Sequence, residues 1–407
     1  MKSDFINELG TLFNQNNSIS DDIYNKLDVK RGLRNKNGTG VLVGLTKIGS
    51  VLGYSVNKKG KKIPEKGKLY YRGISIDKLV EQFEEEKTFC FEKTMFLLLF
   101  GKVPSNFELK MFVSTLKEYR HLPDEFIEDF ILRKPSTDIM NHLQRAVLCL
   151  YTLDENPDDV SLSNLIDQSL NLIAKFPSLL VYCYQACNYK HFKKSLIIHN
   201  PMEEYSIAEN ILHMLRSDSK FTKLESEILD LILVIHAEHG GGNNSTFTSH
   251  VISSTRTDTY SSISASIGSL KGPMHGGANS MVTKMIEDMK KKSNPYDEIK
   301  LKEYLKQIFE KKAFDKTGRI YGMGHAVYTV SDPRAEILKK KAYELAKEKN
   351  ALEEFELFSN VEKFTKEIGK ELKGKDFEIC ANVDLYSGFV YKLLNIPQNI
   401  FTPLFAL

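Results

Sequence analysis

The histidines of this 407-residue chain are unevenly distributed, and four of the ten lie in one stretch. Two glycine clusters lie in the same stretch, and each contains or adjoins a histidine. Glycine lets the backbone approach a ligand closely and adopt dihedral angles that a Cβ forbids. Glycine beside histidine, twice within a short segment, is therefore typical of an active site rather than of a core. The stretch is Leu229–Val282, the clusters are Gly240–Gly242 and Gly272–Gly277, and the histidines are His236, His239, His250 and His275.

His275 follows a Gly-Pro turn signal, and from Met274 onward the apolar pattern predicts a helix. The histidine is therefore expected in, or just before, a first helical turn. Backbone N–H groups are unpaired there and the helix dipole is positive. An imidazole in that field tends to stay neutral and to donate a hydrogen bond, which suits the polarisation of a carbonyl group.

Three other residues complete a constellation that could do chemistry. His325 lies on a glycine-containing loop, GRIYGMGHAVYTVSDPRAE, which also carries Arg334, and Asp384 lies in the segment EICANVDLYSG. Removal of a proton next to a carbonyl needs a general base and an electrophile at the oxygen. Asp384 could be the base, His275 the polariser and His325 a proton donor, while the planar fork of Arg334 suits a carboxylate.

Each of these residues also has an ordinary structural interpretation. His325 alone could be a hydrogen-bonded loop residue, and Asp384 alone a turn residue or a helix cap. The pair His236 and His239, with Glu238 between them, could share a metal ion, but the sequence lacks the HExxH spacing and glycines follow at once. We therefore expect no metal. Neither a GxSxG nucleophile motif nor a GxxxxGK[ST] phosphate loop is present.

Most of the chain shows the three- and four-residue periodicity of helices. A buried central helix is expected to end at His236, Pro177 is expected to kink or divide a long helix, and His142 and Arg145 are expected on an ordinary helix surface. Residues 40–70 favour a small strand pair, with a first strand around 41–45 and a solvated lysine run. The sequence therefore predicts a mainly α protein with a minor β-hairpin. The helices are expected at 75–101, 107–116, 139–153, 162–189, 205–215, 221–236, 284–316, 336–350 and 353–373.

Composition limits the class of protein. A hydrophobic content of 42% allows a large core, which at this length is expected to be divided between two domains. The net charge of +3 argues against nucleic acid as a partner, and no apolar run reaches the roughly eighteen residues of a membrane span. The N-terminal residues lack a signal peptide pattern. Five cysteines in apolar surroundings indicate buried thiols and a reduced cytoplasm.

Four sequence blocks resemble the signature blocks of the citrate synthase family, in order and at the expected separations. They are HAEHGGGN (236–243), GPMHGGAN (272–279), YGMGHAVYTVSDPRA (321–335) and NVDLYSG (382–388). The segments 31–49, 69–79 and 96–104 also resemble the bacterial form of that family. The resemblance implies a mostly helical homodimer in which a large domain, residues 1–276 and 396–407, carries an inserted small domain, residues 277–395. The active site would lie between the two domains.

The resemblance also implies a reaction that needs no cofactor, the condensation of acetyl-CoA with oxaloacetate and the hydrolysis of the thioester to citrate and CoA. By motif, His275 would hold the acetyl carbonyl, Asp384 would take the methyl proton, and His325 would polarise and protonate the keto oxygen. Oxaloacetate would be bound by His239, Asn243 and Arg334. CoA would lie along Arg319, Ile320, Gly322, Met323 and Asn382, with Arg34 and small-domain lysines as weaker candidates for its phosphates.

Two alternatives stay open at this point. A 2-methylcitrate synthase would use propionyl-CoA, and one methylene is worth only ~1–3 kcal/mol in a pocket. The family pattern continues beyond FTPLFAL with an arginine segment, about two residues after Leu407 by the motif spacing. A chain that ends at Leu407 would be expected to bind oxaloacetate poorly, or to be an inactive relative. Hinges for domain closure are expected near Gly276–Gly277 and Leu393–Pro397.

Overall fold

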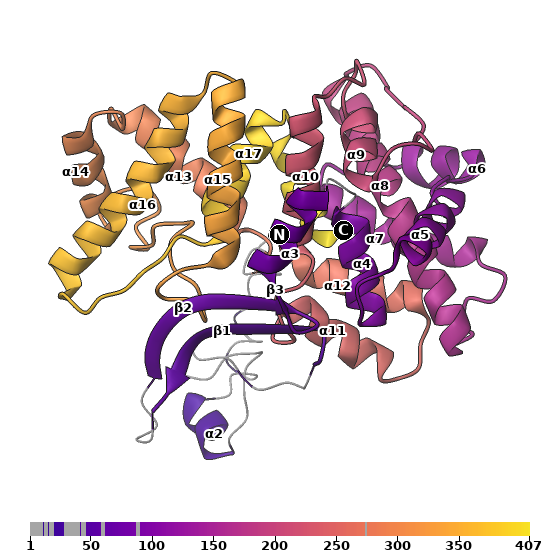
Figure 1. Cartoon of the computed structure of the whole chain (residues 1–407), viewed down its shortest axis with the longest axis horizontal. Coiled ribbons are helices and arrows are strands. Elements are labelled where there is room, and N and C mark those ends of the chain that lie inside the picture. The colour runs from indigo at the N-terminus through magenta and orange to yellow at the C-terminus, as the bar shows by residue number, and fades with distance from the viewer. Residues whose placement is uncertain are drawn as a thin grey trace. The chain divides into compact units, whose positions relative to one another are not determined.

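A computed structural model describes residues 11, 15, 20–27, 41, 46–57, 62–86, 90–272 and 275–407. Its contacts divide the chain into two compact units, residues 1–44 and residues 45–407. Helix α2 (Asp21–Lys26) belongs to the first unit, and the elements below belong to the second (Figure 1). The large and small domains expected from the family resemblance, with boundaries at 276/277 and 395/396, stay a prediction.

The second unit is mainly helical, which confirms the predicted fold class. Its helices are α3 (Ile76–Glu86), α4 (Cys90–Phe100), α5 (Asn106–Tyr119), α6 (Asp124–Phe126), α7 (Ile139–Cys149), α8 (Leu162–Phe192), α9 (Ile207–Leu215), α10 (Lys223–His236), α11 (Asn244–Ser253), α12 (Thr259–Lys271), α13 (Ala278–Lys292), α14 (Glu298–Phe309), α15 (Pro333–Glu348), α16 (Leu352–Lys373), α17 (Val383–Leu393) and α18 (Phe401–Ala406). A π-helical turn covers Ile127–Leu132, and 3₁₀ turns cover Leu150–Leu153 and Gln398–Ile400.

The predicted small sheet is present and antiparallel, in the order β1 (Gly49–Val56), β2 (Lys62–Tyr71) and β3 (Ile74–Ser75). Residues 42–45, where the first strand was expected, lie outside the described residues, as does the lysine run at 58–61. Two glycines let the sheet pack closely on the loop before α15. A Cβ on Gly53 would lie 2.5 Å from the Val327 carbonyl oxygen, and one on Gly67 would lie 2.1 Å from that of Ser331.

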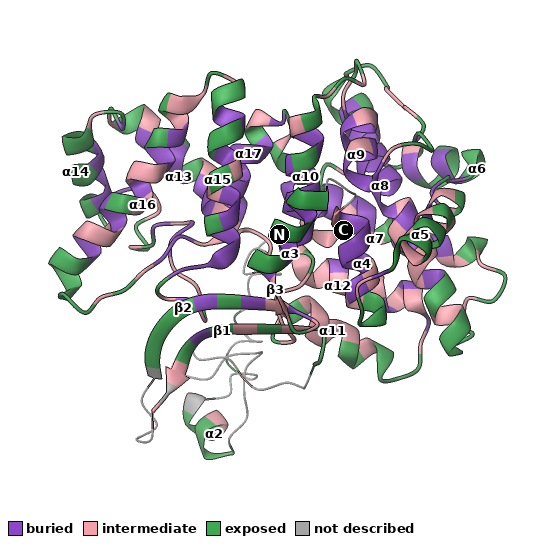
Figure 2. Cartoon of the chain, in the orientation of Figure 1, coloured by how far each residue is buried: buried purple, intermediate pink, exposed green. Residues whose placement is uncertain are grey.

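Helix α10 is the buried central helix that the sequence predicted. Its N-terminus carries a capping box, in which the Thr222 side chain and the Glu225 side chain each pair with the other residue's backbone N–H. The residues from Ile228 to Ile235 are buried. The helix ends at His236 and so brings His239 to the loop that follows. Buried residues also line α8 and α15 (Figure 2).

The helices differ from the sequence analysis in three places. Helix α8 continues through Pro177, so the proline does not divide it, and the alternative of a kink stays a prediction. The Ser/Thr-rich segment after His239 forms α11 and α12, because Asn243 and Asp258 cap their first turns and α12 packs on α7. His142 is buried, 1% exposed, because its face of α7 packs against α8 and the π-helical turn, whereas Arg145 is exposed as expected.

Cys183, Cys187 and Cys380 are buried, which confirms the expected buried thiols in part; Cys90 and Cys149 are half-buried. Among the residues that the structure describes, no helix has the length and apolar character needed to cross a membrane.

Candidate active site

The structure brings His239, His325 and Arg334 together around the ring of Tyr328. The centroids of the His239 and His325 rings lie 4.9 Å apart, and the His239 and Tyr328 rings lie 5.5 Å apart. The guanidinium carbon of Arg334 lies 6.0 Å from the Tyr328 ring centroid. His239 comes from the loop after α10, and the other three come from the loop before α15 and its first turn. Segments far apart in the sequence therefore meet at one site.

The loop that carries His325 is fixed to the start of α17. Gly324 donates its N–H to the Cys380 carbonyl at 2.7 Å, and Asn382 donates its N–H to the Gly322 carbonyl at 2.9 Å. The Asn382 side chain donates to the Gly324 carbonyl at 2.8 Å. Gly322 and Gly324 have φ values of +83° and +86°, which side chains rarely adopt. These contacts hold the loop beside the helix that carries Asp384.

The hydrogen bonds of His325 indicate which nitrogen carries its proton. Its Nδ1 accepts hydrogen bonds from the backbone N–H groups of Val327 at 3.0 Å and Tyr328 at 3.2 Å. A ring nitrogen that accepts from two donors has no hydrogen of its own, so the neutral ring is protonated at Nε2. His325 is therefore oriented as a hydrogen-bond donor through Nε2, as a proton donor would need to be, and its catalytic role stays a prediction.

Asp384 lies in the first turn of α17, where its N–H donates to the Asn382 side chain at 3.0 Å. Burial raises the pKa of its carboxyl to about 6; the Arg334 charge lowers this pKa and the Asp332 charge raises it. A carboxyl that titrates near neutral pH is still ionised under physiological conditions and is a stronger base than an ordinary aspartate.

Arg334 is 7% exposed and forms a two-point ion pair with Asp332. Its Nε lies 3.0 Å from Asp332 Oδ1, and its Nη2 lies 2.7 Å from Oδ2. Asp332 Oδ1 also accepts the Arg334 N–H and so caps α15. This pair occupies one edge of the guanidinium, because a fork binds a carboxylate through two neighbouring nitrogens. Nη1 is the nitrogen outside the pair, on the edge suited to a second carboxylate.

His275 lies in a turn three residues before α13, as the sequence predicted. Its Nε2 lies 3.1 Å from Ser245 Oγ, which also lies 3.0 Å from the Ser266 carbonyl oxygen. Burial lowers the pKa of His275, so the ring stays neutral at physiological pH. The single hydroxyl hydrogen of Ser245 can be donated either to the Ser266 carbonyl or to His275 Nε2, and donation to Nε2 leaves the His275 proton on Nδ1. Sequence reasoning missed Ser245, whose only local signal is its position two residues after the cap Asn243.

His236 and His239 are half-buried and neutral, and Nδ1 and Nε2 of His236 and Nε2 of His239 are inaccessible to solvent. Burial lowers the pKa of His236 to about 3 and that of His239 to about 2, and the Arg334 charge acts in the same direction on both. His236 stacks on Phe405, with ring centroids 4.0 Å apart. Within the described ranges, no group of three or more His, Cys, Asp or Glu side chains is arranged to hold a metal ion.

The other predicted binding residues lie at the start of α11, in the loop that carries His325 and at the start of α17. Asn243 accepts hydrogen bonds from the N–H groups of Ser245 and Thr246 and so caps α11. The residues predicted to line CoA lie in the His325 loop and at the start of α17: Arg319 is exposed, Ile320 and Met323 are buried, and Gly322 and Asn382 join the two segments. Arg34 lies outside the described residues.

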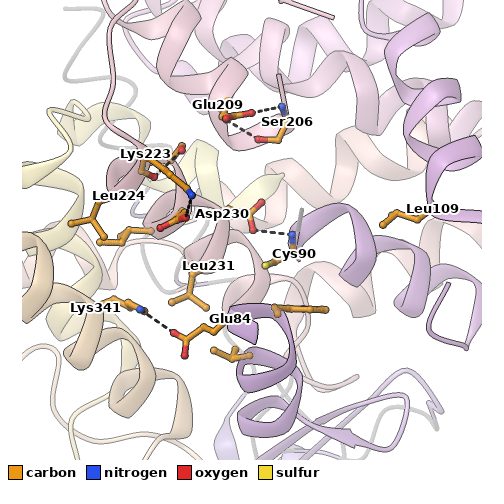
Figure 3. Close-up of a pocket in the computed structure, with 15 residues that line it drawn as sticks. Glu84, Cys90, Leu109, Ser206, Glu209, Lys223, Leu224, Asp230, Leu231 and Lys341 are labelled. Atoms are coloured by element: carbon orange, nitrogen blue, oxygen red, sulfur yellow. Dashed lines mark hydrogen bonds and ion pairs between the residues drawn. The ribbon is translucent and has the colours of Figure 1, made fainter. Parts of the chain in front are cut away.

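A separate pocket of about 650 Å³ lies between α3, α5, α10 and α15 (Figure 3). Lys341 pairs with Glu84 at 2.9 Å, and the Asp230 carboxylate accepts the Cys90 N–H at 3.2 Å. These polar groups pair with one another at the pocket wall. None of the predicted catalytic residues lines it. The pocket is therefore distinct from the site built by the histidines.

Comparison with known proteins agrees with the sequence blocks. The family described as "Citrate synthase, C-terminal domain" matches residues 37–407. The chain is 31% identical to the citrate synthase of Haloferax volcanii, over 93% of this chain and 88% of that protein. It is 32% identical to 2-methylcitrate synthase 1 of Corynebacterium glutamicum, over 85% and 84%. The citrate synthase of Thermoplasma acidophilum, solved in a ternary complex with carboxymethyl coenzyme A and oxaloacetate, superposes with a TM-score of 0.68, 26% identity and coverage of 91% and 88%.

Proposed function

Because this chain belongs to the citrate synthase family, we propose that it condenses acetyl-CoA with oxaloacetate and hydrolyses the product thioester to citrate and CoA. The observation that carries the proposal is the cluster of His239, His325, Arg334 and Asp384. Within it, the Asp384 carboxyl, with a pKa of about 6, is close enough to Arg334 to feel its charge, and the His325 imidazole is protonated at Nε2. A base and a proton donor of this kind are what carbon–carbon bond formation next to a carbonyl requires.

In the proposed reaction, the Asp384 carboxylate removes a proton from the methyl group of acetyl-CoA. His275 donates a hydrogen bond to the carbonyl oxygen on which the enol forms. The enol carbon then attacks the keto carbon of oxaloacetate, and the keto oxygen takes the proton from Nε2 of His325. Water finally cleaves the thioester and releases the CoA thiol. Each step uses a group whose protonation state follows from its surroundings.

The proposed oxaloacetate site uses Arg334, His239 and Asn243. Arg334 retains Nη1 outside its pair with Asp332 and offers it to a substrate carboxylate. The Nε2 atom of His239 is buried and finds no hydrogen-bond partner among the described residues. A buried polar atom without a partner is costly, and a ligand oxygen would remove that cost. The CoA-binding segment of the proposal is Arg319–Met323 with Asn382.

A second candidate is 2-methylcitrate synthase, which is favoured by the 32% identity to the Corynebacterium glutamicum protein over 85% of this chain. The two reactions differ by one methylene in the acyl group, worth ~1–3 kcal/mol in a pocket. Because that difference corresponds to roughly 10- to 200-fold in kcat/KM, direct comparison separates the candidates.

The test is a thiol-release assay with purified protein, oxaloacetate and either acetyl-CoA or propionyl-CoA. We expect release that requires both substrates and is faster, in kcat/KM, with acetyl-CoA. His325→Gln should abolish most of it, whereas His250→Gln, an exposed histidine on α11, should not. A preference for propionyl-CoA would assign the second candidate. No release with either acyl-CoA, by a folded protein that binds oxaloacetate, would refute the proposal.

We also propose a homodimer in the cytoplasm, with a small domain that closes on the large one when oxaloacetate binds. The buried thiols of Cys183, Cys187 and Cys380 suit a reducing compartment. Closure would exclude water from a reactive enol. Light scattering should give twice the chain mass of 46.5 kDa. Small-angle scattering should show a smaller radius of gyration with oxaloacetate; an unchanged radius at saturation would refute closure about Gly276–Gly277 and Leu393–Pro397.

A further inference from the structure

We propose that Tyr328 is a positioning residue for His325, and that its ring, rather than its hydroxyl, holds the imidazole as a donor through Nε2. The catalytic role of His325 in this inference rests on the proposed function, whereas the contacts between His325 and Tyr328 do not depend on it. Tyr328 lies three residues after His325 in the loop before α15. Its residue type gave no functional signal in the sequence, because tyrosines next to helices are most often core residues.

Tyr328 holds His325 in two independent ways. The two rings stack with centroids 4.7 Å apart and an interplanar angle of 27°. The backbone N–H of Tyr328 also donates to Nδ1 of His325 at 3.2 Å, beside the Val327 N–H at 3.0 Å. The stacking restricts the plane of the imidazole, and the N–H groups keep Nδ1 unprotonated. Together they aim the Nε2–H bond in one direction.

The ring of Tyr328 can act as a support because it is itself immobilised. It is 1% exposed and packs against the sheet at Gly67, where a Cβ would lie 2.7 Å from Tyr328 Cδ1. Its other contacts are with the site: the edge of His239 at 5.5 Å and the Arg334 guanidinium at 6.0 Å. Aromatic pairs and cations over a ring each add directional attraction. One ring thus forms a shared wall for three site residues.

The hydroxyl of Tyr328 contributes little to this arrangement. Its oxygen is buried and has no hydrogen-bond partner among the described residues. An unpaired buried hydroxyl opposes folding, so its removal should be neutral or stabilising. The ring and the hydroxyl can therefore be tested separately, because phenylalanine keeps the first and removes the second.

The experiment compares Tyr328→Phe, Tyr328→Leu and the control Phe364→Leu in the thiol-release assay. Phe364 is fully buried in α16, and its replacement removes a ring of similar size away from His325. We expect Tyr328→Phe and the control to keep near wild-type kcat. Tyr328→Leu should lose roughly 10- to 100-fold in kcat, with a smaller change in KM, because general acid catalysis is worth roughly 10²–10⁴-fold. If the leucine variant does not fold, Tyr328→Met replaces it.

A second readout does not depend on turnover. Two-bond ¹H–¹⁵N spectra of protein labelled with ¹⁵N-histidine report the protonated nitrogen of each ring, and His325→Gln assigns the signal. We expect a neutral Nε2–H form in the wild type and in Tyr328→Phe, and a mixture of forms in Tyr328→Leu.

Three results would overturn the inference: equal losses in the phenylalanine and leucine variants, an equal loss in the Phe364 control, or an unchanged His325 form in Tyr328→Leu. If the wild type releases no thiol, the proposed function fails and the spectra alone decide the role of Tyr328.

Discussion

Replacement of Asp384 by asparagine should lower activity and, at alkaline pH, raise stability. The pKa of the Asp384 carboxyl rises from 3.8 to about 6 in the folded protein. One pKa unit corresponds to 1.36 kcal/mol, so ionisation of this carboxyl in the folded state costs about 3 kcal/mol more than in the unfolded chain. Asparagine has nearly the same shape and no charge. Asp384→Asn should therefore remove that cost together with the general base.

The sign of the pH dependence follows from which state binds the proton more tightly. Because the folded-state pKa is the higher one, the carboxyl favours folding below about pH 3.8, and this contribution is lost as the pH rises through about 6. Asp384→Asn should therefore be more stable than the wild type by up to about 3 kcal/mol at pH 8, and the difference should shrink toward pH 4. The same carboxyl must be ionised to act as a base, so wild-type kcat/KM should fall below about pH 6.

Urea unfolding at pH 8 and at the lowest pH where the protein stays folded measures the change in the free energy of unfolding. Asp376→Asn, at an exposed loop carboxyl, is the control and should change neither this free energy nor kcat. The thiol-release assay measures the second effect, where kcat should fall by roughly 10²–10⁴-fold while oxaloacetate still binds. A variant that is no more stable than the wild type at pH 8, or one with near-normal turnover, would refute the reasoning.

Three further substitutions test the surroundings of the site. Asp332→Asn removes a negative charge that raises the pKa of Asp384, so the acidic limb of the kcat/KM profile should move to lower pH. Ser245→Ala removes the hydrogen bond to His275 Nε2 and should lower kcat by roughly tenfold, the effect of ~1.4 kcal/mol, with little change in KM for oxaloacetate. Gly67→Ala puts a Cβ 2.1 Å from a carbonyl oxygen of the loop before α15, and urea unfolding should show a loss of roughly 1–3 kcal/mol.

The two histidines that the sequence identified, His239 and His325, each lie beside a glycine. These histidines and Arg334 were each ambiguous alone; in the structure the two imidazole rings lie 4.9 Å apart, and Arg334 lies over the ring of Tyr328. The two glycine-containing loops signalled close backbone approach, and Gly322 and Gly324 adopt the positive φ values that explain them. Residue type and local turn chemistry thus identified residues that the structure brings together, and their roles in the site stay a prediction.

What the sequence could not predict depends on tertiary partners. Serine and tyrosine are common in cores and helix starts, so the contacts of Ser245 with His275 and of Tyr328 with His325 have no local signature. Helices α11 and α12 were not predicted, because serine and threonine disfavour helix interiors. Their helix caps and the packing of α12 on α7, which offset that preference, are tertiary or capping contacts. His142 was predicted to lie on a helix surface, because the sequence of α7 does not show that α8 and the π-helical turn cover it.

Burial is the main cause of the pKa shifts of His236, His239 and Asp384, and the buried cation Arg334 modifies all three. The Arg334 charge lowers the pKa values of His236 and His239 and also that of Asp384, so it favours neutral imidazoles and an ionised base at once. An unpaired buried guanidinium would be costly, and Asp332 removes most of that cost through two hydrogen bonds. The pair also limits how far the field of Arg334 acidifies Asp384, because the Asp332 charge opposes it there. The base therefore retains a pKa near neutrality beside an arginine, which allows one site both to attract a dianion and to remove a proton from carbon.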